Sequence, residues 1–217
     1  MMQEAPFRID QFGTAICAAP GPWRARFEQD FALRLFGVFL PEQLAKLVDH
    51  AARTHFVDDH VKGIGDRAIE SPQRIGAALS LMLHDIKLLQ WVEQATGVGP
   101  LRAVAGRLAE TRANGSDALG WHDDREDFNR LLAVVINLSD RQFTGGRFEL
   151  RRKREEQPHL VFDHDRQGSM LIFAVRPDLE HRVTPLTSGG PRRVFAGWFL
   201  SRPEHETGSL ASEVSAG

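Results

Sequence analysis

The second half of this chain consists of short apolar segments separated by turn residues. From Leu101 onward, runs rich in Val, Leu, Ile and Phe alternate with Gly, Asp, Asn and Pro, a pattern typical of β-strands joined by turns. Such a succession restricts the chain to a core built on a sheet. We expect strands at Leu101–Thr111, Leu131–Leu138, Arg147–Arg151, Ser169–Phe173, His181–Val183 and Arg193–Leu200.

The last of these strands is apolar on both of its faces. Side chains alternate between the two faces of a strand. Here one face carries Val194, Ala196, Trp198 and Leu200, and the other Phe195, Gly197 and Phe199. A strand of this kind belongs to a sheet that is covered on both sides.

Two helices are expected to precede the strands. Apolar residues recur at helical spacing over Pro41–Arg53 and again from Ile75 to about Gly97. The polar, glycine-bearing segment Val57–Gln73 between them is expected to be a mobile loop and is our candidate for a substrate lid. Helices followed by strands indicate an α+β fold, or a β-sandwich with helices packed on one sheet.

We expect one domain with a short tail. Residues 1–100 are expected to form an N-terminal extension with the supporting helices, and residues 101–202 the β core. Residues 203–217 are small and polar, which predicts a disordered tail. The first two dozen residues are rich in Gly, Pro and Ala and are expected to wrap the domain loosely.

Composition excludes several classes of protein. The chain has 217 residues and one cysteine, Cys17, so it cannot be a disulfide scaffold. Its 27 basic and 29 acidic residues balance, which argues against a nucleic-acid partner. The longest strongly apolar stretch, around Ala77 to Leu83, is shorter than the roughly 20 residues of a membrane span. We expect a cytoplasmic protein without a membrane partner.

The segment Trp121-His122-Asp123-Asp124 contains a possible pair of metal ligands. On an extended backbone the side chains at i and i+2 share a face, so His122 and Asp124 can reach one ion. One imidazole and one carboxylate are two thirds of the facial triad that binds non-haem Fe(II). The pair is short enough to occur by chance, and alone it is more often a surface turn than a metal site.

Two residues further along the chain could complete such a site. His181 opens an apolar segment well beyond the first pair, where a third ligand on a separate strand would lie. Arg192 opens the last strand beside Val194, where a buried guanidinium needs an anionic partner. A guanidinium can grip a carboxylate through two hydrogen bonds. Alone, Arg192 would also fit a solvated strand end.

From Ala105 to Leu200 the chain resembles the iron- and 2-oxoglutarate-dependent oxygenases, and among them the prolyl 4-hydroxylase-like branch. Five motifs in the family's order carry the resemblance. They are WHDD, then NRLLAVVINLSD followed by TGGRFEL, then GSMLIFAV, then HRVTPLTSGGPRR, and finally GWFL.

The resemblance implies a fold and a site. The fold is a distorted double-stranded β-helix, a jelly roll, with the N-terminal helices on its larger sheet. The implied Fe(II) ligands are His122, Asp124 and His181. The implied partner of the distal carboxylate of 2-oxoglutarate is Arg192, six positions before Trp198, whereas Arg193 should point away. We take Asn137 and Trp198 as further cosubstrate-binding candidates.

Two departures from the family pattern concern the cosubstrate pocket. The family often has Tyr-Leu where this chain has Asn137 and Leu138, and the chain contains no Tyr at all. A hydroxyl residue is frequent two positions after the basic residue, and here Val194 stands there. These changes do not affect the assigned iron ligands or Arg192. They leave the other contacts to the cosubstrate undetermined.

The implied activity is hydroxylation of an unactivated C–H bond, with O2 as oxidant, decarboxylation of 2-oxoglutarate to succinate, and ascorbate as a candidate reductant. The branch suggests a prolyl residue in a peptide or protein as substrate. A free amino acid, a small natural product and a non-catalytic metal-binding sensor remain as alternatives. A nucleic-acid demethylase is disfavoured by the balanced charge. The oligomeric state stays open.

Other patterns carry no function in this interpretation. The GxGxxA match at Gly63–Ala68 has no βαβ context, so we do not expect dinucleotide binding. His84, His159 and His164 are interpreted as satisfied or solvated histidines rather than ligands.

Overall fold

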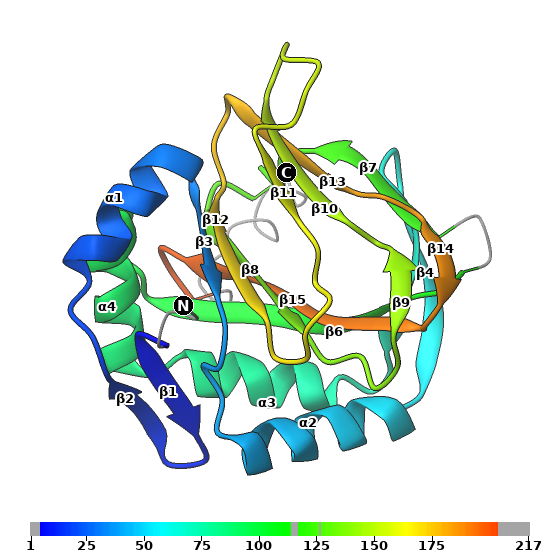
Figure 1. The fold of residues 1–217 in the computed structure, drawn as a ribbon, viewed down its shortest axis with the longest axis horizontal. Helices are drawn as coiled ribbons and strands as arrows, with labels where there is room; N and C mark the ends of the chain where they lie inside the picture. The colour runs from blue at the N-terminus through cyan, green and yellow to red at the C-terminus, as the bar shows by residue number, and fades with distance from the viewer. Residues whose placement is uncertain (1–4, 114–116, 126, 204–217) are drawn as a thin grey trace, which may run out of the picture.

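A computed structural model describes residues 5–113, 117–125 and 127–203. From residue 204 on, the predicted tail lies outside the described residues. Figure 1 shows a large sheet that curls around on itself, with helices along one side and one end. The helices are α1 Gly21–Asp30, α2 Pro41–Arg53, α3 Arg74–Leu83 and α4 Ile86–Thr96.

Strands dominate the described residues, and their pairing is antiparallel throughout the large sheet. They are β1 Phe7–Asp10, β2 Gly13–Ile16, β3 Ala32–Leu35, β4 Phe56–Val61, β5 Gly65–Glu70, β6 Ala103–Thr111, β7 Ala118–His122, β8 Arg130–Asn137, β9 Phe143–Gly145, β10 Phe148–Arg152, β11 Leu160–Phe162, β12 Met170–Ala174, β13 Leu179–Val183, β14 Leu186–Gly189 and β15 Arg192–Leu200.

The large sheet has 11 strands in the order β11-β10-β13-β7-β5-β6-β15-β8-β12-β3, with β4 paired to β5. This confirms the expected mainly-β jelly roll with helices on its larger face. All six predicted strands are present, within two residues at each end. The pairs β1-β2 and β14-β9 form separate two-stranded sheets.

Strand β15 lies at the centre of the larger face. It pairs with β6 along its whole length and with β8 on its other side. Phe195 and Phe199 are completely buried, and α3 packs against both β6 and β15 (Figure 1). The apolar residues on both faces of the predicted strand therefore fit a sheet covered by helices on one side and by its own curl on the other.

The second predicted helix is two helices. Helix α3 ends at Leu83, and α4 begins after Asp85, whose Oδ1 accepts hydrogen bonds from the backbone N–H of Lys87 (2.8 Å) and Leu88 (3.3 Å). An Asp that caps a helix in this way satisfies N–H groups that have no partner within the first turn. The apolar periodicity continues across the break, which explains why the sequence predicted one element.

The N-terminal residues are more ordered than expected. They form the β1-β2 hairpin and α1, which buries Trp23 and Phe27, and Leu33 of β3 pairs with Ile172 at the edge of the large sheet. The loose wrapping predicted for this region is therefore wrong. Because β3 and β5 are strands of the same sheet as β6, the first hundred residues and the β core share one framework.

The predicted lid loop is instead the β4-β5 hairpin, which is joined to the sheet through β6 and β7. Its residues are polar and partly exposed, so it lacks the apolar alternation that marks a half-buried strand. The GxGxxA match covers its turn and the start of β5. Gly63 there has φ +75°, and a Cβ on Gly65 would collide with the carbonyl oxygen of Ala118.

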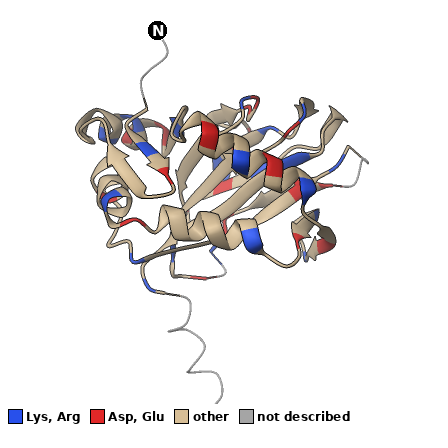
Figure 2. Cartoon of the chain, turned by 90° about the horizontal axis from the view of Figure 1, so that it is seen from below, with Lys and Arg blue, Asp and Glu red and all other residues tan. Residues whose placement is uncertain are grey.

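Figure 2 shows Lys and Arg interspersed with Asp and Glu over the elements in view, as the balanced composition predicts. Among the described residues, no helix has the length and apolar character that crossing a bilayer requires.

Candidate metal and cosubstrate site

Two neighbouring strands bring the two predicted histidine ligands together. His122 at the end of β7 is the register partner of His181 on β13, and their ring centroids lie 4.1 Å apart. Asp124 follows two residues later with φ +59°. Its Oδ1 lies 3.5 Å from Nε2 of His122, and its Oδ2 lies 3.6 Å from Nε2 of His181. Sequence spacing predicted that His122 and Asp124 lie together, and the family resemblance added His181.

Hydrogen bonds hold two of the three side chains. The indole Nε1 of Trp198 donates to Asp124 Oδ2 over 2.9 Å. Nδ1 of His122 lies 2.7 Å from the carbonyl oxygen of Gly120. A carbonyl can only accept, so Nδ1 carries the proton of this hydrogen bond, and Nε2 faces Asp124 and His181. Such outer partners fix the orientation of metal ligands.

The third side chain, His181, is oriented by apolar packing. It is only 7% exposed and contacts the rings of Phe148 and Phe173, with centroids at 5.6 and 4.7 Å. Desolvation by this burial lowers the pKa of His181 to about 4, although the nearby Asp124 opposes the shift. The imidazole is therefore neutral at pH 7, as a metal ligand must be.

The donor set fits a divalent cation. Ligand atoms of His122, Asp124 and His181 all lie within 4.8 Å of one another. Two imidazoles and one carboxylate form a facial triad, which suits Fe(II) and leaves coordination positions open. All three side chains line a pocket, so the open positions have room for a ligand.

An inner pocket of about 80 Å³ joins this triad to Arg192. Arg192 is 3% exposed, and within the described residues its buried Nε has no hydrogen-bond partner. Burial lowers the pKa of Arg192 to about 10, so it stays charged at pH 7. A buried cation without a counter-ion is costly. The pocket therefore has a metal-ligand set and an uncompensated positive charge, as a chelating dicarboxylate would require.

Arg193 points out of the pocket, as its strand parity predicted. It forms ion pairs with Glu110 (2.9 Å) and Asp140 (2.6 Å). The two adjacent arginines therefore have opposite environments, one satisfied by carboxylates and one left for a ligand.

The other predicted site residues have different positions. Trp198 lines the pocket. The side chain of Asn137 does not, because its amide group donates to the carbonyls of His164 and Arg166 and accepts from the N–H of Ser139. Trp121, the first residue of the WHDD motif, contacts the guanidinium groups of Arg151 and Arg182 (3.8 and 4.6 Å to its ring centroid) and lines neither the pocket nor the cleft described below.

Sequence reasoning missed two residues near Arg192. Thr111 is the register partner of Arg192 and lines the inner pocket. His164 is fully buried, with Nδ1 3.1 Å from Oγ of Ser169 and no partner for Nε2. Burial, together with the positive charge of Arg192, holds the pKa of His164 well below its usual value. No sequence motif marks either residue, since both depend on how the strands pair.

A larger outer cleft of about 360 Å³ opens beside two of the triad residues, His122 and Asp124. His122, Asp124 and Trp198 line both spaces. The β4-β5 hairpin forms one wall of the cleft through residues that include Asp59 and Arg67. The segment predicted as a lid is thus a wall of the site, although it is a hairpin rather than a loop.

Comparison with known proteins identifies this arrangement. Residues 108–200 match the family described as the 2OG-Fe(II) oxygenase superfamily, which implies Fe(II) and 2-oxoglutarate. No curated protein sequence gives a significant match.

Three solved structures share the fold. An oxidoreductase of the 2OG-Fe(II) oxygenase family from Burkholderia pseudomallei is 16% identical, with a TM-score of 0.62 over 93% of this chain and 97% of its own. A Pseudomonas putida prolyl-4-hydroxylase is also 16% identical, with a TM-score of 0.63 over 84% and 99%. A Trichoplax adhaerens prolyl hydroxylase, solved with a peptide fragment of the hypoxia inducible factor oxygen degradation domain, is 13% identical, with a TM-score of 0.58 over 84% and 89%.

The family match covers the strands that carry the triad and Arg192, and the structural matches extend the same fold over the N-terminal helices. The chain is therefore an enzyme whose β core matches the 2OG-Fe(II) oxygenase superfamily and whose fold is that of the solved structures above.

Proposed function

We propose that the chain is an Fe(II)- and 2-oxoglutarate-dependent dioxygenase that hydroxylates a C–H bond. His122, Asp124 and His181 would hold the iron, and Arg192 would pair with the distal carboxylate of 2-oxoglutarate. The observation that supports this most strongly is that one pocket is lined by the His-Asp-His triad, with a buried and neutral His181, and by a buried Arg192 that has no counter-ion among the described residues.

The chemistry that Fe(II) and 2-oxoglutarate supply when bound is the activation of O2, coupled to decarboxylation of 2-oxoglutarate to succinate and transfer of one oxygen atom to the substrate. The protein's own residues bind and orient. Trp198 fixes the carboxylate of Asp124, and Phe148 and Phe173 keep water from His181. Arg192 supplies a charge that does not titrate near neutral pH.

Thr111 would supply the hydroxyl contact that the missing tyrosine provides elsewhere in the family. It stands directly across from Arg192 on the neighbouring strand. Neutral side chains on the same wall, such as Val194 and Ala196, leave few other polar groups in the inner pocket. A single hydroxyl beside a guanidinium can orient a carboxylate through one additional hydrogen bond.

A prolyl residue in a peptide or protein is the first substrate to test. Two of the structural relatives are a prolyl-4-hydroxylase and a prolyl hydroxylase bound to a peptide. A free amino acid or a small natural product is the alternative for the same chemistry, and a metal-binding sensor is the alternative without it. We propose a cytoplasmic enzyme, with ascorbate as a reductant that keeps the iron ferrous.

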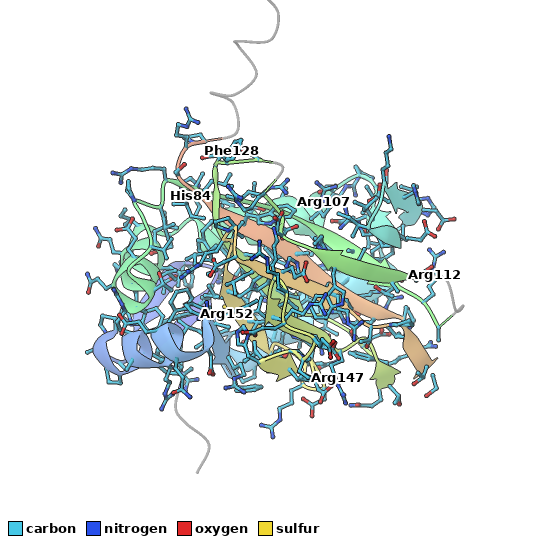
Figure 3. The ribbon with its side chains drawn as sticks, turned by 90° about the horizontal axis from the view of Figure 1, so that it is seen from above. His84, Arg107, Arg112, Phe128, Arg147 and Arg152 are labelled. Carbon is cyan, nitrogen blue, oxygen red and sulfur yellow. The ribbon has the colours of Figure 1, made fainter. Side chains whose placement is uncertain are left out.

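The decisive experiment measures succinate released from 2-oxoglutarate by the full-length protein with Fe(II) in air. The wild type should release succinate, and His181→Ala and Arg192→Gln should each abolish most of the release. His84→Ala is the matched control, because His84 is an exposed residue at the end of α3 and lies outside the site (Figure 3). Equal release by wild type and His181→Ala would refute the proposal.

A further inference from the structure

Asp124 has a backbone conformation that is uncommon for a residue with a side chain. Its φ is +59°, in the left-handed region, and it lies two residues beyond His122, the last residue of β7. Contacts from the surrounding fold have to compensate for the strain of such a conformation. Both carboxylate oxygens depend on it, because Oδ1 faces His122 and Oδ2 faces His181. The contacts that hold the backbone of Asp124 therefore bear on the metal site.

Arg130 at the start of β8 contacts Asp124 directly. Its Nη1 donates a hydrogen bond to the backbone oxygen of Asp124 over 3.3 Å. A guanidinium bound to a backbone carbonyl restrains the peptide plane rather than the carboxylate. This contact therefore acts on the left-handed turn itself.

The same guanidinium lies against the indole of Trp198. Its central carbon is 3.8 Å from the ring centroid, well within the range of a cation–π interaction. Trp198 in turn donates its indole N–H to Oδ2 of Asp124 over 2.9 Å. Arg130, Trp198 and Asp124 therefore form a closed triangle in which each residue contacts the other two.

A shift of strand register directs Arg130 toward this triangle. Trp198 of β15 pairs with Ala133 of β8, so in a regular register Leu200 would pair with Leu131. It pairs with Arg130 instead. Residues directly opposite each other share a face of the sheet, as do residues two apart on one strand. The shift therefore brings Arg130 to the face of Trp198, as bulges beside active sites commonly re-aim a side chain.

We propose that Arg130 is a positioning residue of the metal site, which holds Asp124 in its left-handed turn both through the backbone carbonyl and through Trp198. The inference rests on the proposed function. Arg130 supplies no ligand atom, and its part is to keep the carboxylate directed at the two histidines. A ligand that is held in place in advance binds more tightly, because less freedom is lost when the metal binds.

The experiment measures Fe(II) binding to the full chain by anaerobic titration calorimetry. Arg130→Met keeps a long side chain and removes both contacts, so it should bind Fe(II) about tenfold more weakly than the wild type. Arg130→Lys should have an intermediate affinity, because an ammonium group keeps the charge near the indole but lacks the planar donor group.

Arg147→Met is the control and should bind Fe(II) as the wild type does. Arg147 is half-exposed and pairs with Asp163 (Figure 3). It lines neither the inner pocket nor the outer cleft. The control therefore removes an arginine from a strand region without touching the triangle.

Two further measurements separate positioning of the ligand from a general contribution to folding. Arg130→Met combined with Trp198→Phe should weaken Fe(II) binding by less than the product of the two single losses, because both residues act on Asp124. Co(II) in place of Fe(II) reports the coordination geometry. Its visible ligand-field bands should shift in Arg130→Met and stay unchanged in Arg147→Met. A change of stability alone would alter thermal unfolding of the metal-free protein and leave these bands in place.

Wild-type Fe(II) affinity or unshifted Co(II) bands in Arg130→Met, an equal loss in Arg147→Met, or single losses that multiply in the double variant would each overturn the inference. If thermal unfolding shows that Arg130→Met does not fold, Arg130→Lys carries the test, and wild-type affinity in that variant overturns it. Failure of the proposed function is seen separately. In that case, succinate release in air is absent even where the Fe(II) affinity depends on Arg130.

Discussion

The indole of Trp198 on β15 donates a hydrogen bond to Asp124, a residue 74 positions earlier in the chain. The bond links the central strand of the larger face to the loop that follows β7. It fixes one carboxylate oxygen of a residue whose backbone lies in the left-handed region. The position of the carboxylate therefore depends on a strand that contributes no ligand atom itself.

Replacing Trp198 with Phe should weaken metal binding while leaving the three ligands in place. The ring would still pack, but the N–H donor to Asp124 would be lost. Loss of such an outer contact typically lowers the metal affinity by about tenfold to hundredfold, and we expect a decrease of that size here. Anaerobic titration with Fe(II) measures it, with Trp121→Phe as the control because Trp121 lies outside the site. Unchanged affinity in Trp198→Phe would show that the bond does not support the ligand.

Replacing Arg192 with Met should raise the stability of the ligand-free protein. The substitution removes a buried charge whose Nε has no hydrogen-bond partner in the part of the chain that the structure describes, and such changes can stabilise by about 1–4 kcal/mol. The same variant should no longer be stabilised by added 2-oxoglutarate. Thermal unfolding with and without 2-oxoglutarate measures both effects. Arg193→Met should instead destabilise, since it breaks the ion pairs with Glu110 and Asp140. A less stable Arg192→Met variant would contradict the expectation.

Thr111→Val should lower the affinity for 2-oxoglutarate and spare the affinity for Fe(II). Valine keeps the shape of the side chain and removes the hydroxyl beside Arg192. One lost hydrogen bond of about 0.5–1.5 kcal/mol corresponds to roughly a threefold to tenfold weaker binding. Calorimetric titration with each ligand separates the two affinities. A parallel loss of both would point to a distorted pocket rather than a missing contact.

The stability of the metal-free protein should fall as the pH falls below about 6.5. Burial lowers the pKa of His181 to about 4 and holds that of His164 well below its usual value. In this range the unfolded chain binds protons at both residues, whereas the native protein does not. Each histidine therefore removes about 1.4 kcal/mol of stability per pH unit, until the pH reaches its native pKa.

Urea unfolding between about pH 7.5 and pH 5 checks this slope. His164→Asn should reduce this slope by the contribution of one proton. A stability that is flat with pH in the wild type would mean that the buried histidines ionise in the native protein.

Gly76→Ala should destabilise the fold. A Cβ at this position of α3 would lie 3.0 Å from Cα of Arg107 and 3.1 Å from the backbone nitrogen of Leu108, so the helix would have to move away from β6. Overpacking of this kind costs about 1–3 kcal/mol. Gly21→Ala is the matched control, since nothing lies within 4 Å of a Cβ there. Equal free energies of unfolding for the two variants would refute the close approach.

Local patterns predicted the parts of the site that depend on strand parity. His122 and Asp124 lie two apart, and the alternation along the last strand separated the buried Arg192 from Arg193, which pairs with carboxylates on the opposite face. The second of these predictions needs only the geometry of one extended segment, whereas Asp124 lies beyond the end of β7 with φ +59°.

The remaining parts depend on contacts between distant segments. The β4-β5 hairpin is polar because it stands at the edge of a cleft, so hydrophobic periodicity cannot reveal it. Asn137 was a candidate for binding the cosubstrate, but its side-chain amide donates a hydrogen bond to the backbone carbonyl of His164 instead. Arg130 meets Trp198 and Asp124 only when β8, β15 and the loop after β7 are placed together.

Strand β15 carries Arg192 at one end and Trp198 near the other, and it is hydrogen-bonded to a neighbour on each side. At about 3.3 Å per residue, their backbones stand about 20 Å apart along one straight segment. The strand thus fixes the separation between Arg192 and Trp198. A one-residue insertion between them would turn either Arg192 or Trp198 toward the helix-covered face of the sheet. Evolution can therefore vary the lengths of the surrounding loops far more freely than the length of this strand.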